Sequence, residues 1–304
     1  MPAVSIIMNV RNGAATVREA LQSALQQTVS GWELIVWDDQ STDDSARIVA
    51  QFSDNRIRYF LAQRDMSLGQ AREAAISHAQ GEWLAFLDQD DIWSPRKLEL
   101  QLALAGPTDV GLVYGRTLAF YPNGRQHDHD TFYEFCPLPE GNILAELLGR
   151  GCFIAMSSAM LRRSAVLAAG VIPDHIRITP DYFLYLSVCG HYAARAVQEV
   201  VCRYRVHPGS MTSVYRYDAL KETLQLVEQW RGSLPPETFA RRTRQIQTAI
   251  AFEELRRAAT FSEGLRRLLA VGSLFWMLGR PFVRAGRGLR RLVEQPYWKK
   301  SDAE

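Results

Sequence analysis

The sequence predicts an α/β protein in which a mostly parallel sheet carries helices on both faces and is followed by a helical extension. Short apolar runs alternate with helical patterns over the first hundred residues, as in parallel sheets that are buried on both sides. Acidic residues directly follow two of these runs, at 38–39 and 88–91. Beyond residue 215 helical patterns dominate, so we expect a domain over 1–215 and a basic helical extension over 216–304.

Four apolar runs in the first hundred residues have the length and composition of buried strands. Helical spacing separates them, and Val17 and Leu21 share one face of the first helix. The residues from Ser41 to Asp44 resemble a helix N-cap, and Gly81 ends the third helix. We therefore expect strands at 4–8, 32–37, 56–61 and 83–87, and helices at 16–28, 41–52 and 68–79.

The alternation continues beyond Pro95 with longer connections. The segment 121–139 is rich in turn-forming residues and receives no assignment. The spacing of apolar residues predicts further helices at 96–104, 142–148, 181–189, 218–231 and 237–259, and strands at 110–120, 157–162 and 196–205.

The composition is that of an ordinary globular protein, with 47% hydrophobic and 22% charged residues. None of the four cysteines has the spacing of a CxxC pair or a metal site, so we expect reduced thiols in the cytoplasm. The apolar run at 4–10 is too short for a signal peptide, and no apolar run reaches the length of about 18 residues that a membrane span needs. The charge is uneven, because residues 215–304 contain 17 Lys/Arg against 10 Asp/Glu.

The most informative stretch is the acidic turn, Asp88-Gln89-Asp90-Asp91, which follows the apolar run at 83–87. Carboxylates this close together repel one another unless a cation lies among them. Their oxygen atoms suit Mg²⁺ or Mn²⁺, and both ions commonly bridge to the phosphates of a substrate. Ligands of parallel sheets bind beyond the carboxyl ends of the strands, where residues 38–39 are also expected. The alternative is a solvated turn that is rich in aspartate.

Together these motifs resemble the inverting glycosyltransferases of family 2, which have the GT-A nucleotide-sugar fold. The resemblance covers about residues 3–215. In family order, the matching stretches are 4–13, 27–28, 33–43, 69–72, 81–91 and 204–210. The chain departs from the family at Asn9, Gln40, Glu73 and Pro180, where Pro, Gly, Asn and an acidic residue are often found. These departures concern the donor pocket more than the class of reaction.

The resemblance implies that a nucleoside pocket follows the first two strands. Asp38 or Asp39 would contact the base or ribose, with Asp39 favoured, because a carboxylate accepts hydrogen bonds from an N–H or a hydroxyl. Asn12 and Arg11 would line the same pocket. The competing interpretations are a capping acid for the helix that begins near Ser41 and a plain turn.

The resemblance also implies a site for the donor's diphosphate. Arg72 would brace the acidic site or contact the diphosphate, unless it is a surface arginine. Asp90 would bind the metal. Asp91 would bind the metal as well or point toward the acceptor, and His207 would contact the metal or a phosphate. Asp88 would act through the ribose or the outer shell of the metal. A lone histidine such as His207 is also compatible with a purely structural role.

Inversion requires a base on the sugar face opposite the leaving diphosphate. Asp181 stands at the family's position for this base, at the beginning of a helix, and would take the proton of the acceptor hydroxyl. The preceding Thr179-Pro180 equally fits a helix N-terminus at which Asp181 only caps. Asp174 is the competing candidate base. Trp93 would pack either on the acceptor sugar or in the core.

We therefore expect a metal-dependent transferase that moves a sugar from a nucleoside-diphosphate donor, with UDP favoured, to a glycan or lipid-linked acceptor. The resemblance suggests bacterial surface polysaccharide or lipopolysaccharide assembly. The alternative of a sugar nucleotidyltransferase would require a glycine-rich basic loop after the first strand. Residues 9–15, which follow that strand, contain a single glycine, Gly13. A noncatalytic nucleotide-sugar-binding scaffold would not need both Asp90 and Asp181.

The segment 265–300 contains nine Lys/Arg and one acid beside apolar and aromatic residues. This pattern is typical of a helix lying on an anionic bilayer, so we expect peripheral association with the inner face of the cytoplasmic membrane. The alternative is packing on the domain or against a partner in a homodimer. Nucleic acid is not an expected partner, because no recognised binding module accompanies the basic residues.

Overall fold

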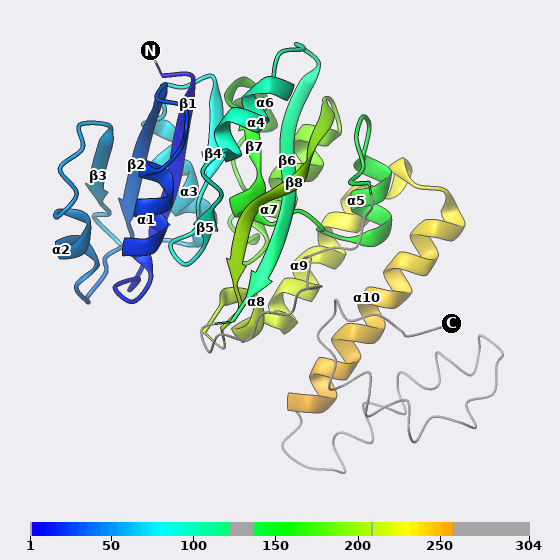
Figure 1. The fold of residues 1–304 in the computed structure, drawn as a ribbon. Helices are drawn as coiled ribbons and strands as arrows, with labels where there is room; N and C mark the ends of the chain where they lie inside the picture. The colour runs from blue at the N-terminus through cyan, green and yellow to red at the C-terminus, as the bar shows by residue number, and fades with distance from the viewer. Residues whose placement is uncertain (1, 122–136, 208, 258–304) are drawn as a thin grey trace. The chain divides into compact units, whose positions relative to one another are not determined.

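The computed structural model describes residues 2–121, 137–207 and 209–257 (Figure 1). The chain divides into two compact units, Met1–Val214 and Tyr215–Glu304. The strands and the acidic turn all belong to the first unit. No helix among the described residues has both the length and the apolar character that crossing a membrane requires.

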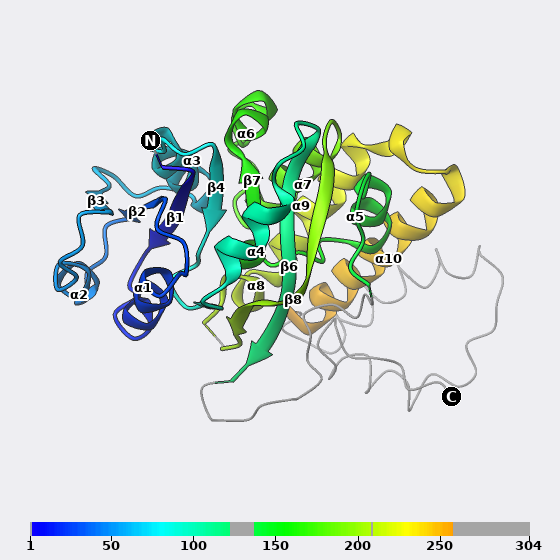
Figure 2. The same ribbon diagram turned by 45° about the horizontal axis from the view of Figure 1, so that its top comes forward.

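The sheet of the first unit contains eight strands within the described residues. They are β1 Val4–Val10, β2 Trp32–Asp38, β3 Ile57–Leu61, β4 Trp83–Phe86, β5 Ile92–Trp93, β6 Val110–Phe120, β7 Met160–Arg162 and β8 Ala193–Arg205. Their order across the sheet is β3-β2-β1-β4-β7-β6-β8-β5. Strands β1 to β4 are parallel to one another, and β6 is parallel to β8, whereas β7 and β5 pair antiparallel with their neighbours. Figure 2 shows β6 and β8 side by side over much of their length.

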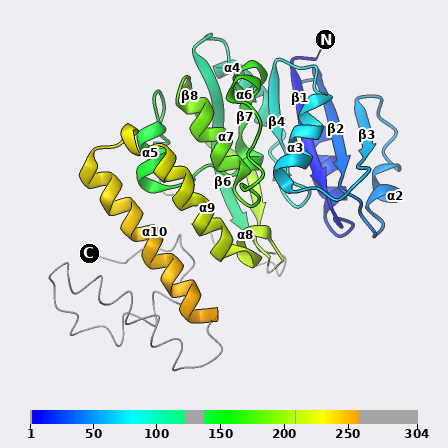
Figure 3. The ribbon, with the colours of Figure 1, turned by 180° about the vertical axis from the view of Figure 1, so that it is seen from behind.

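Helices cover both faces of the sheet, so the predicted α/β class is confirmed. Figures 1 and 3 show α1 and α4 over one face and α3 and α7 over the other. The described helices of this unit are α1 Val17–Leu25, α2 Ser45–Val49, α3 Leu68–Ser77, α4 Lys97–Leu104, α5 Leu144–Arg150, α6 Arg163–Ala169, α7 Pro180–Cys189, α8 Met211–Val214 and the 3₁₀ turn η1 Met156–Ser158. The second unit contains α9 Arg216–Gln229, η2 Arg231–Ser233 and α10 Pro236–Arg257.

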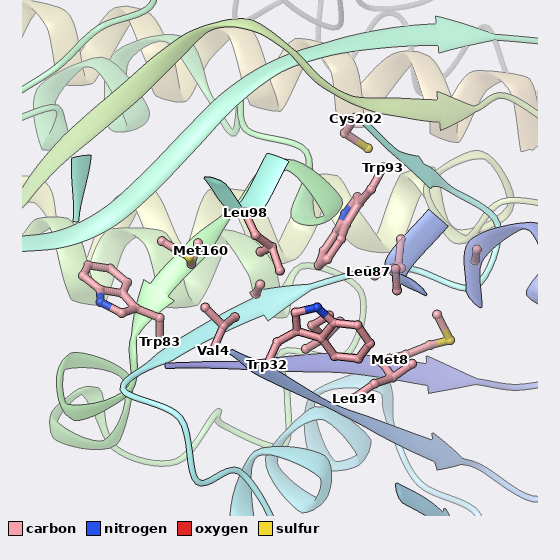
Figure 4. Packing of buried hydrophobic residues seen from close by; sticks show 14 of the residues in the cluster. Val4, Met8, Trp32, Leu34, Trp83, Leu87, Trp93, Leu98, Met160 and Cys202 are labelled. Atoms are coloured by element: carbon pink, nitrogen blue, oxygen red, sulfur yellow. The ribbon is translucent and has the colours of Figure 1, made fainter. Parts of the chain in front are cut away.

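The core beneath α1 follows from the alternation of side chains along each strand. Val4, Ile6, Met8 and Val10 of β1 all belong to one buried cluster with alternate residues of β2 and β4. Figure 4 shows Val4, Met8, Trp32, Leu34 and Trp83 of this cluster. Full burial of a large apolar side chain contributes about 1.5–3 kcal/mol to the free energy of unfolding. The opposite faces of the same strands point toward α3, and both faces are therefore buried.

Several predicted elements differ from the structure. The strand expected at 157–162 is confined to Met160–Arg162, because η1 precedes it and the Ser158 hydroxyl donates to the Ala155 carbonyl over 2.8 Å. The helix expected at 41–52 is confined to Ser45–Val49, since the Asp43 carboxylate binds the Ser45 amide and hydroxyl and holds the preceding loop. Strand β5 and helices α6 and α8 were not predicted. The end of the helix expected at 237–259 and most of the unassigned segment 121–139 lie outside the described residues.

Candidate active site

The loop after β1 and the acidic turn after β4 are joined by a side chain of the turn itself. Gln89 accepts a hydrogen bond from the Arg11 amide over 2.9 Å and donates to the Arg11 carbonyl over 3.1 Å. Gly13 makes room for this contact, because a Cβ there would lie 2.3 Å from Gln89 Oε1. The β2 end joins the same edge, since the Asp39 amide donates to the Val10 carbonyl over 2.8 Å. The carboxyl ends of β1, β2 and β4 therefore meet, as the sequence predicts.

Both carboxylate oxygens of Asp38 accept hydrogen bonds from residues of the same domain. Its Oδ1 accepts from the Ser41 amide over 2.7 Å and its Oδ2 accepts from the Tyr59 hydroxyl over 2.7 Å. The residue is 1% exposed. Burial and the neighbouring Asp38 carboxylate raise the pKa of Tyr59, so the phenol remains a hydrogen-bond donor. One oxygen of Asp38 is therefore committed to the loop after β2 and the other to Tyr59 of β3, so neither is left for a ligand.

Asp39 has one committed oxygen and one that is free. Its Oδ2 accepts from the Arg11 guanidinium over 2.9 Å, and Arg11 also pairs with Asp65. Its Oδ1 is buried without a hydrogen-bond partner among the described residues. Burial raises the pKa of Asp39, and the Arg11 charge opposes that rise. A buried acceptor without a partner costs free energy, so this atom is suited to accept a hydrogen bond from a ligand.

The side-chain oxygen of Asn12 holds the loop after β2. This side-chain Oδ1 accepts from the Thr42 backbone N–H over 2.8 Å, and the backbone N–H of Asn12 donates to the Ser41 hydroxyl over 3.0 Å. Its φ of 50° lies in the left-handed region, which asparagine tolerates better than most residues. Gln40 in the same loop has a φ of 56°. Asn12 therefore shapes the expected nucleoside pocket through the loop.

Arg72 and Asp88 form a partly buried ion pair. Arg72 lies on α3, is 4% exposed, and donates to Asp88 Oδ1 over 3.2 Å. Its second terminal nitrogen is buried and has no hydrogen-bond partner among the described residues. Burial raises the pKa of Asp88, Arg72 opposes the rise, and the charges of Asp90 and Asp181 add to it. Arg72 is thus a buried brace of the acidic turn, with one donor left for a ligand.

Asp90 and Asp91 point to different partners. Asp90 Oδ2 lies 2.8 Å from His207 Nε2, and both side chains remain partly exposed. Asp91 is 1% exposed, and its Oδ1 accepts from the Arg205 amide at the end of β8 over 3.0 Å. Burial, followed by the charges of Asp90 and Asp88, raises the pKa of Asp91 well above its usual value. Asp91 therefore fastens the turn to β8, whereas Asp90 and His207 contact each other and remain accessible to solvent.

Arg205 was part of a matching motif but received no role from the sequence. Its Nε donates to the Asp90 carbonyl over 2.8 Å, and its guanidinium contacts Glu19 of α1 over 2.5 Å. The same guanidinium lies 4.6 Å from the centroid of the Phe120 ring. Arg205 therefore holds the acidic turn against α1 and the end of β6. The only sequence signal for this role is its position two residues before His207.

Asp181 lies in the first turn of α7, where its Oδ1 accepts from the amide of Tyr182 over 2.8 Å. Its charge raises the pKa of Asp88, after burial and the charge of Asp90, which is consistent with a position close to the acidic turn. Asp174 is exposed and accepts a hydrogen bond from Gln70 over 3.0 Å. Of the two candidate bases, Asp181 lies in the first turn of α7 and its charge raises the pKa of Asp88, whereas Asp174 is held by Gln70 of α3.

Trp93 is a core residue. It is 2% exposed and donates from Nε1 to the Ser157 carbonyl over 2.7 Å. Figure 4 shows it between Leu98 and Leu87, within the buried cluster. Stacking on an acceptor sugar is therefore wrong for this residue. Within the described residues, no group of three or more His, Cys, Asp or Glu side chains forms a complete metal site.

Residues 5–168 match the sequence model of Glycosyl transferase family 2. The chain is 32% identical to WfaP of Escherichia coli, a UDP-Glc:alpha-D-GlcNAc-diphosphoundecaprenol beta-1,3-glucosyltransferase, over 70% of this chain and 81% of that protein. It is 30% identical to WfgD of Escherichia coli, which has the same described activity, over 69% of this chain and 79% of that protein. The succinoglycan biosynthesis protein ExoO of Rhizobium meliloti is 26% identical over 93% of this chain and 83% of that protein.

Solved structures show the same fold. S. aureus TarS 1-349 in complex with UDP-GlcNAc has a TM-score of 0.67 at 18% identity, covering 90% of this chain and 80% of that chain. The mannosyltransferase PcManGT from Pyrobaculum calidifontis, in complex with GDP-Man and Mn²⁺, has a TM-score of 0.63 at 17% identity, covering 96% and 79%. These likenesses confirm the GT-A fold.

Proposed function

Because the chain belongs to glycosyl transferase family 2, we propose that it is a metal-dependent inverting glycosyltransferase with a UDP-sugar donor and a lipid-linked acceptor. The observation that carries this proposal is that Arg72, Asp88 and Asp90 meet at the carboxyl edge of the sheet, where the charge of Asp181 also raises the pKa of Asp88. An acidic edge with one buried cation suits a diphosphate that arrives with its own divalent ion.

The nucleoside end of the donor would lie at Asp39. Its buried, unpartnered Oδ1 is an acceptor for a uracil N–H or a ribose hydroxyl. Arg11 holds the other oxygen and so fixes the carboxylate in place. The names of WfaP and WfgD, and the UDP complexes of TarS, support UDP as the nucleotide.

Asp90 and His207 fit the requirements of a divalent ion. Asp90 Oδ2 and His207 Nε2 are 2.8 Å apart, so a carboxylate oxygen and an imidazole nitrogen would be placed together to hold one divalent ion. Only two protein ligands are then needed, because the diphosphate supplies others. When bound, Mg²⁺ or Mn²⁺ would neutralise charge on the leaving diphosphate. The Mn²⁺ complex of PcManGT is consistent with this assignment.

Asp181 would act as the base. Its position at the start of α7 leaves the carboxylate near the acidic turn without making it part of the Asp90–His207 pair. It would accept the proton of the acceptor hydroxyl while the hydroxyl oxygen attacks the anomeric carbon from the face opposite the diphosphate. Arg72 would orient the diphosphate through its free nitrogen.

The acceptor is proposed to be a sugar on a lipid diphosphate, as the names of WfaP and WfgD state for those proteins. An enzyme with such an acceptor works at the membrane, which fits a cytoplasmic protein bound to the inner membrane surface. The basic segment 265–300, which would provide this contact, lies outside the described residues.

The test uses UDP-glucose, Mn²⁺ and a synthetic GlcNAc-diphospholipid. Asp181→Asn should abolish transfer while UDP affinity, measured by calorimetry, stays within about twofold, because the general base contributes about 10²–10⁴-fold to rate but not to nucleotide binding. Asp174→Asn is the matched control and should retain transfer. Full turnover by Asp181→Asn would overturn the base assignment. Absence of UDP binding by the unmodified protein would overturn the donor assignment.

A further inference from the structure

Residues 171–178, here called the strap, connect α6 to α7 and pack on the N-terminal half of α3. Ile172 and Ile176 are 3% and 1% exposed. A Cβ at Gly69 would lie 3.0 Å from Ile172 Cγ2 and 3.4 Å from the Ile176 carbonyl, so the strap and the helix are in close contact. The strap is therefore a packed part of the domain.

Two hydrogen bonds fix the strap to the same helix. The half-buried Glu73 accepts the backbone N–H of Ile172 through Oε1. Gln70, one turn earlier, donates to Asp174 over 3.0 Å. Gln70 is itself held by the capping box that it forms with Ser67. The contact with Glu73 is the more buried of the two, and loss of a buried hydrogen-bond partner is the more costly change.

Each end of this connection leads to a group of the candidate active site. Arg72, which pairs with Asp88, directly precedes Glu73 on α3. Asp181 follows the strap by three residues, in the first turn of α7. The strap contact therefore joins the helix that braces the acidic turn to the helix that carries the proposed base.

We propose that Glu73 is a positioning residue, which sets the place of Asp181 relative to Arg72 and Asp88 through the Ile172 amide. The inference rests on the proposed transfer reaction. Glu73 itself does not touch the reacting atoms. Without its carboxylate, the Ile172 N–H would lose its partner and the strap could shift on α3. A displacement of about 1 Å at a reacting group can lower a rate about 10²-fold.

The experiment compares Glu73→Ala with Glu73→Gln. Glutamine keeps a carbonyl Oε1 that can accept the Ile172 N–H, whereas alanine leaves no acceptor. We expect Glu73→Ala to lower kcat for transfer to the GlcNAc-diphospholipid about 10–100-fold, with KM for UDP-glucose and the Kd for UDP within about twofold. Glu73→Gln should recover most of the loss. Glu82→Ala, which removes an exposed carboxylate paired with Arg162, is the matched control and should behave as the unmodified protein.

Two further readouts separate positioning from a general loss of structure. Hydrogen exchange of peptides covering 171–178 should accelerate in Glu73→Ala, while peptides covering the acidic turn stay protected. Slow hydrolysis of UDP-glucose by water, measured without acceptor, should fall much less than transfer. If Glu73→Ala fails to fold, Asp174→Ala removes the acceptor of the more exposed contact, leaves the capping box of α3 intact, and should lower kcat by severalfold in the same pattern.

The inference is overturned if Glu73→Ala retains full kcat, or if transfer, UDP affinity and exchange across the whole domain worsen together. It is also overturned if Glu73→Gln is as impaired as Glu73→Ala. Failure of the proposed function looks different, because then the unmodified protein transfers no glucose or Asp181→Asn stays active. Normal transfer, an inactive Asp181→Asn and a fully active Glu73→Ala would refute only the role of Glu73.

Discussion

Replacing Lys97 with methionine tests a buried charge at the start of α4. The residue is 0% exposed. Its Nζ donates to Gln101 Oε1 over 2.6 Å and lies 4.2 Å from the centroid of the Trp93 ring. No carboxylate within the described residues forms an ion pair with it. Burial lowers the pKa of Lys97 to about 7.

The direction of the pH effect follows from the two pKa values. The unfolded chain holds the lysine proton up to about pH 10.4, whereas the folded protein releases it near 7. Between these values the unfolded state binds more protons, so the free energy of unfolding rises with pH. The penalty of burying Lys97 is about 4 kcal/mol at pH 7 and about 2 kcal/mol at pH 9. It is fully present below pH 7 and disappears above about pH 10.4.

Methionine has a similar length and no charge, so Lys97→Met removes this penalty. It also deprives Gln101 of a donor, which costs about 1–2 kcal/mol. We expect the variant to be more stable by about 2–3 kcal/mol at pH 7 and nearly equal to the unmodified protein at pH 9. Urea unfolding at pH 6, 7, 8 and 9 measures the difference, and the exposed Lys221→Met is the matched control. A difference that does not change with pH would refute the reasoning, because Lys97 would then not titrate in this range.

Three further predictions concern the candidate site. Gln40→Gly should raise the free energy of unfolding by about 0.5–1 kcal/mol, because glycine adopts its positive φ without strain, and a lower melting temperature would contradict this. Arg205→Ala should weaken UDP–Mn²⁺ binding in calorimetry by about tenfold, since it frees the Asp90 backbone, and unchanged affinity would exclude the bracing role. Asp39→Asn should weaken UDP binding with little change in the free energy of unfolding. Asp38→Asn should instead lower the free energy of unfolding, measured with urea, by about 1–3 kcal/mol. The reverse pattern would exchange the roles of the two residues.

The sheet and the edge that carries the site could be predicted from local patterns. Apolar runs define β1 to β4, and the rule that ligands bind beyond the carboxyl ends of parallel strands places residues 38–39 and 88–91 together. Strand β5 could not be predicted, because two residues have no periodicity and the strand exists only through pairing with β8. Helix α6 was missed because it directly follows β7, with no turn residues to separate the two elements.

The roles of individual carboxylates depended on partners far away in the chain. Asp38 and Asp39 are adjacent in sequence, and their long-range partners differ: the Tyr59 hydroxyl from β3 binds Asp38, and the Arg11 guanidinium binds Asp39. Asp91 stays a predicted metal ligand: its Oδ1 accepts from the Arg205 amide, and its Oδ2 is buried without a hydrogen-bond partner among the described residues. Such contacts are set by the packing of strands, which a single sequence does not specify.

The acidic turn itself shows how a run of like charges can be stable before any ligand arrives. Successive side chains leave the turn toward different parts of the domain: Gln89 toward the loop after β1 and Asp91 toward the end of β8. The remaining two carboxylates each have a side-chain partner, the Arg72 guanidinium for Asp88 and the His207 ring nitrogen for Asp90. Because the two fixing contacts hold the backbone, the other two carboxylates would keep their places on binding of the proposed diphosphate and its ion. The free-energy cost of bringing the negative charges together is therefore met during folding, and binding of a ligand would require little further reorganisation of the turn.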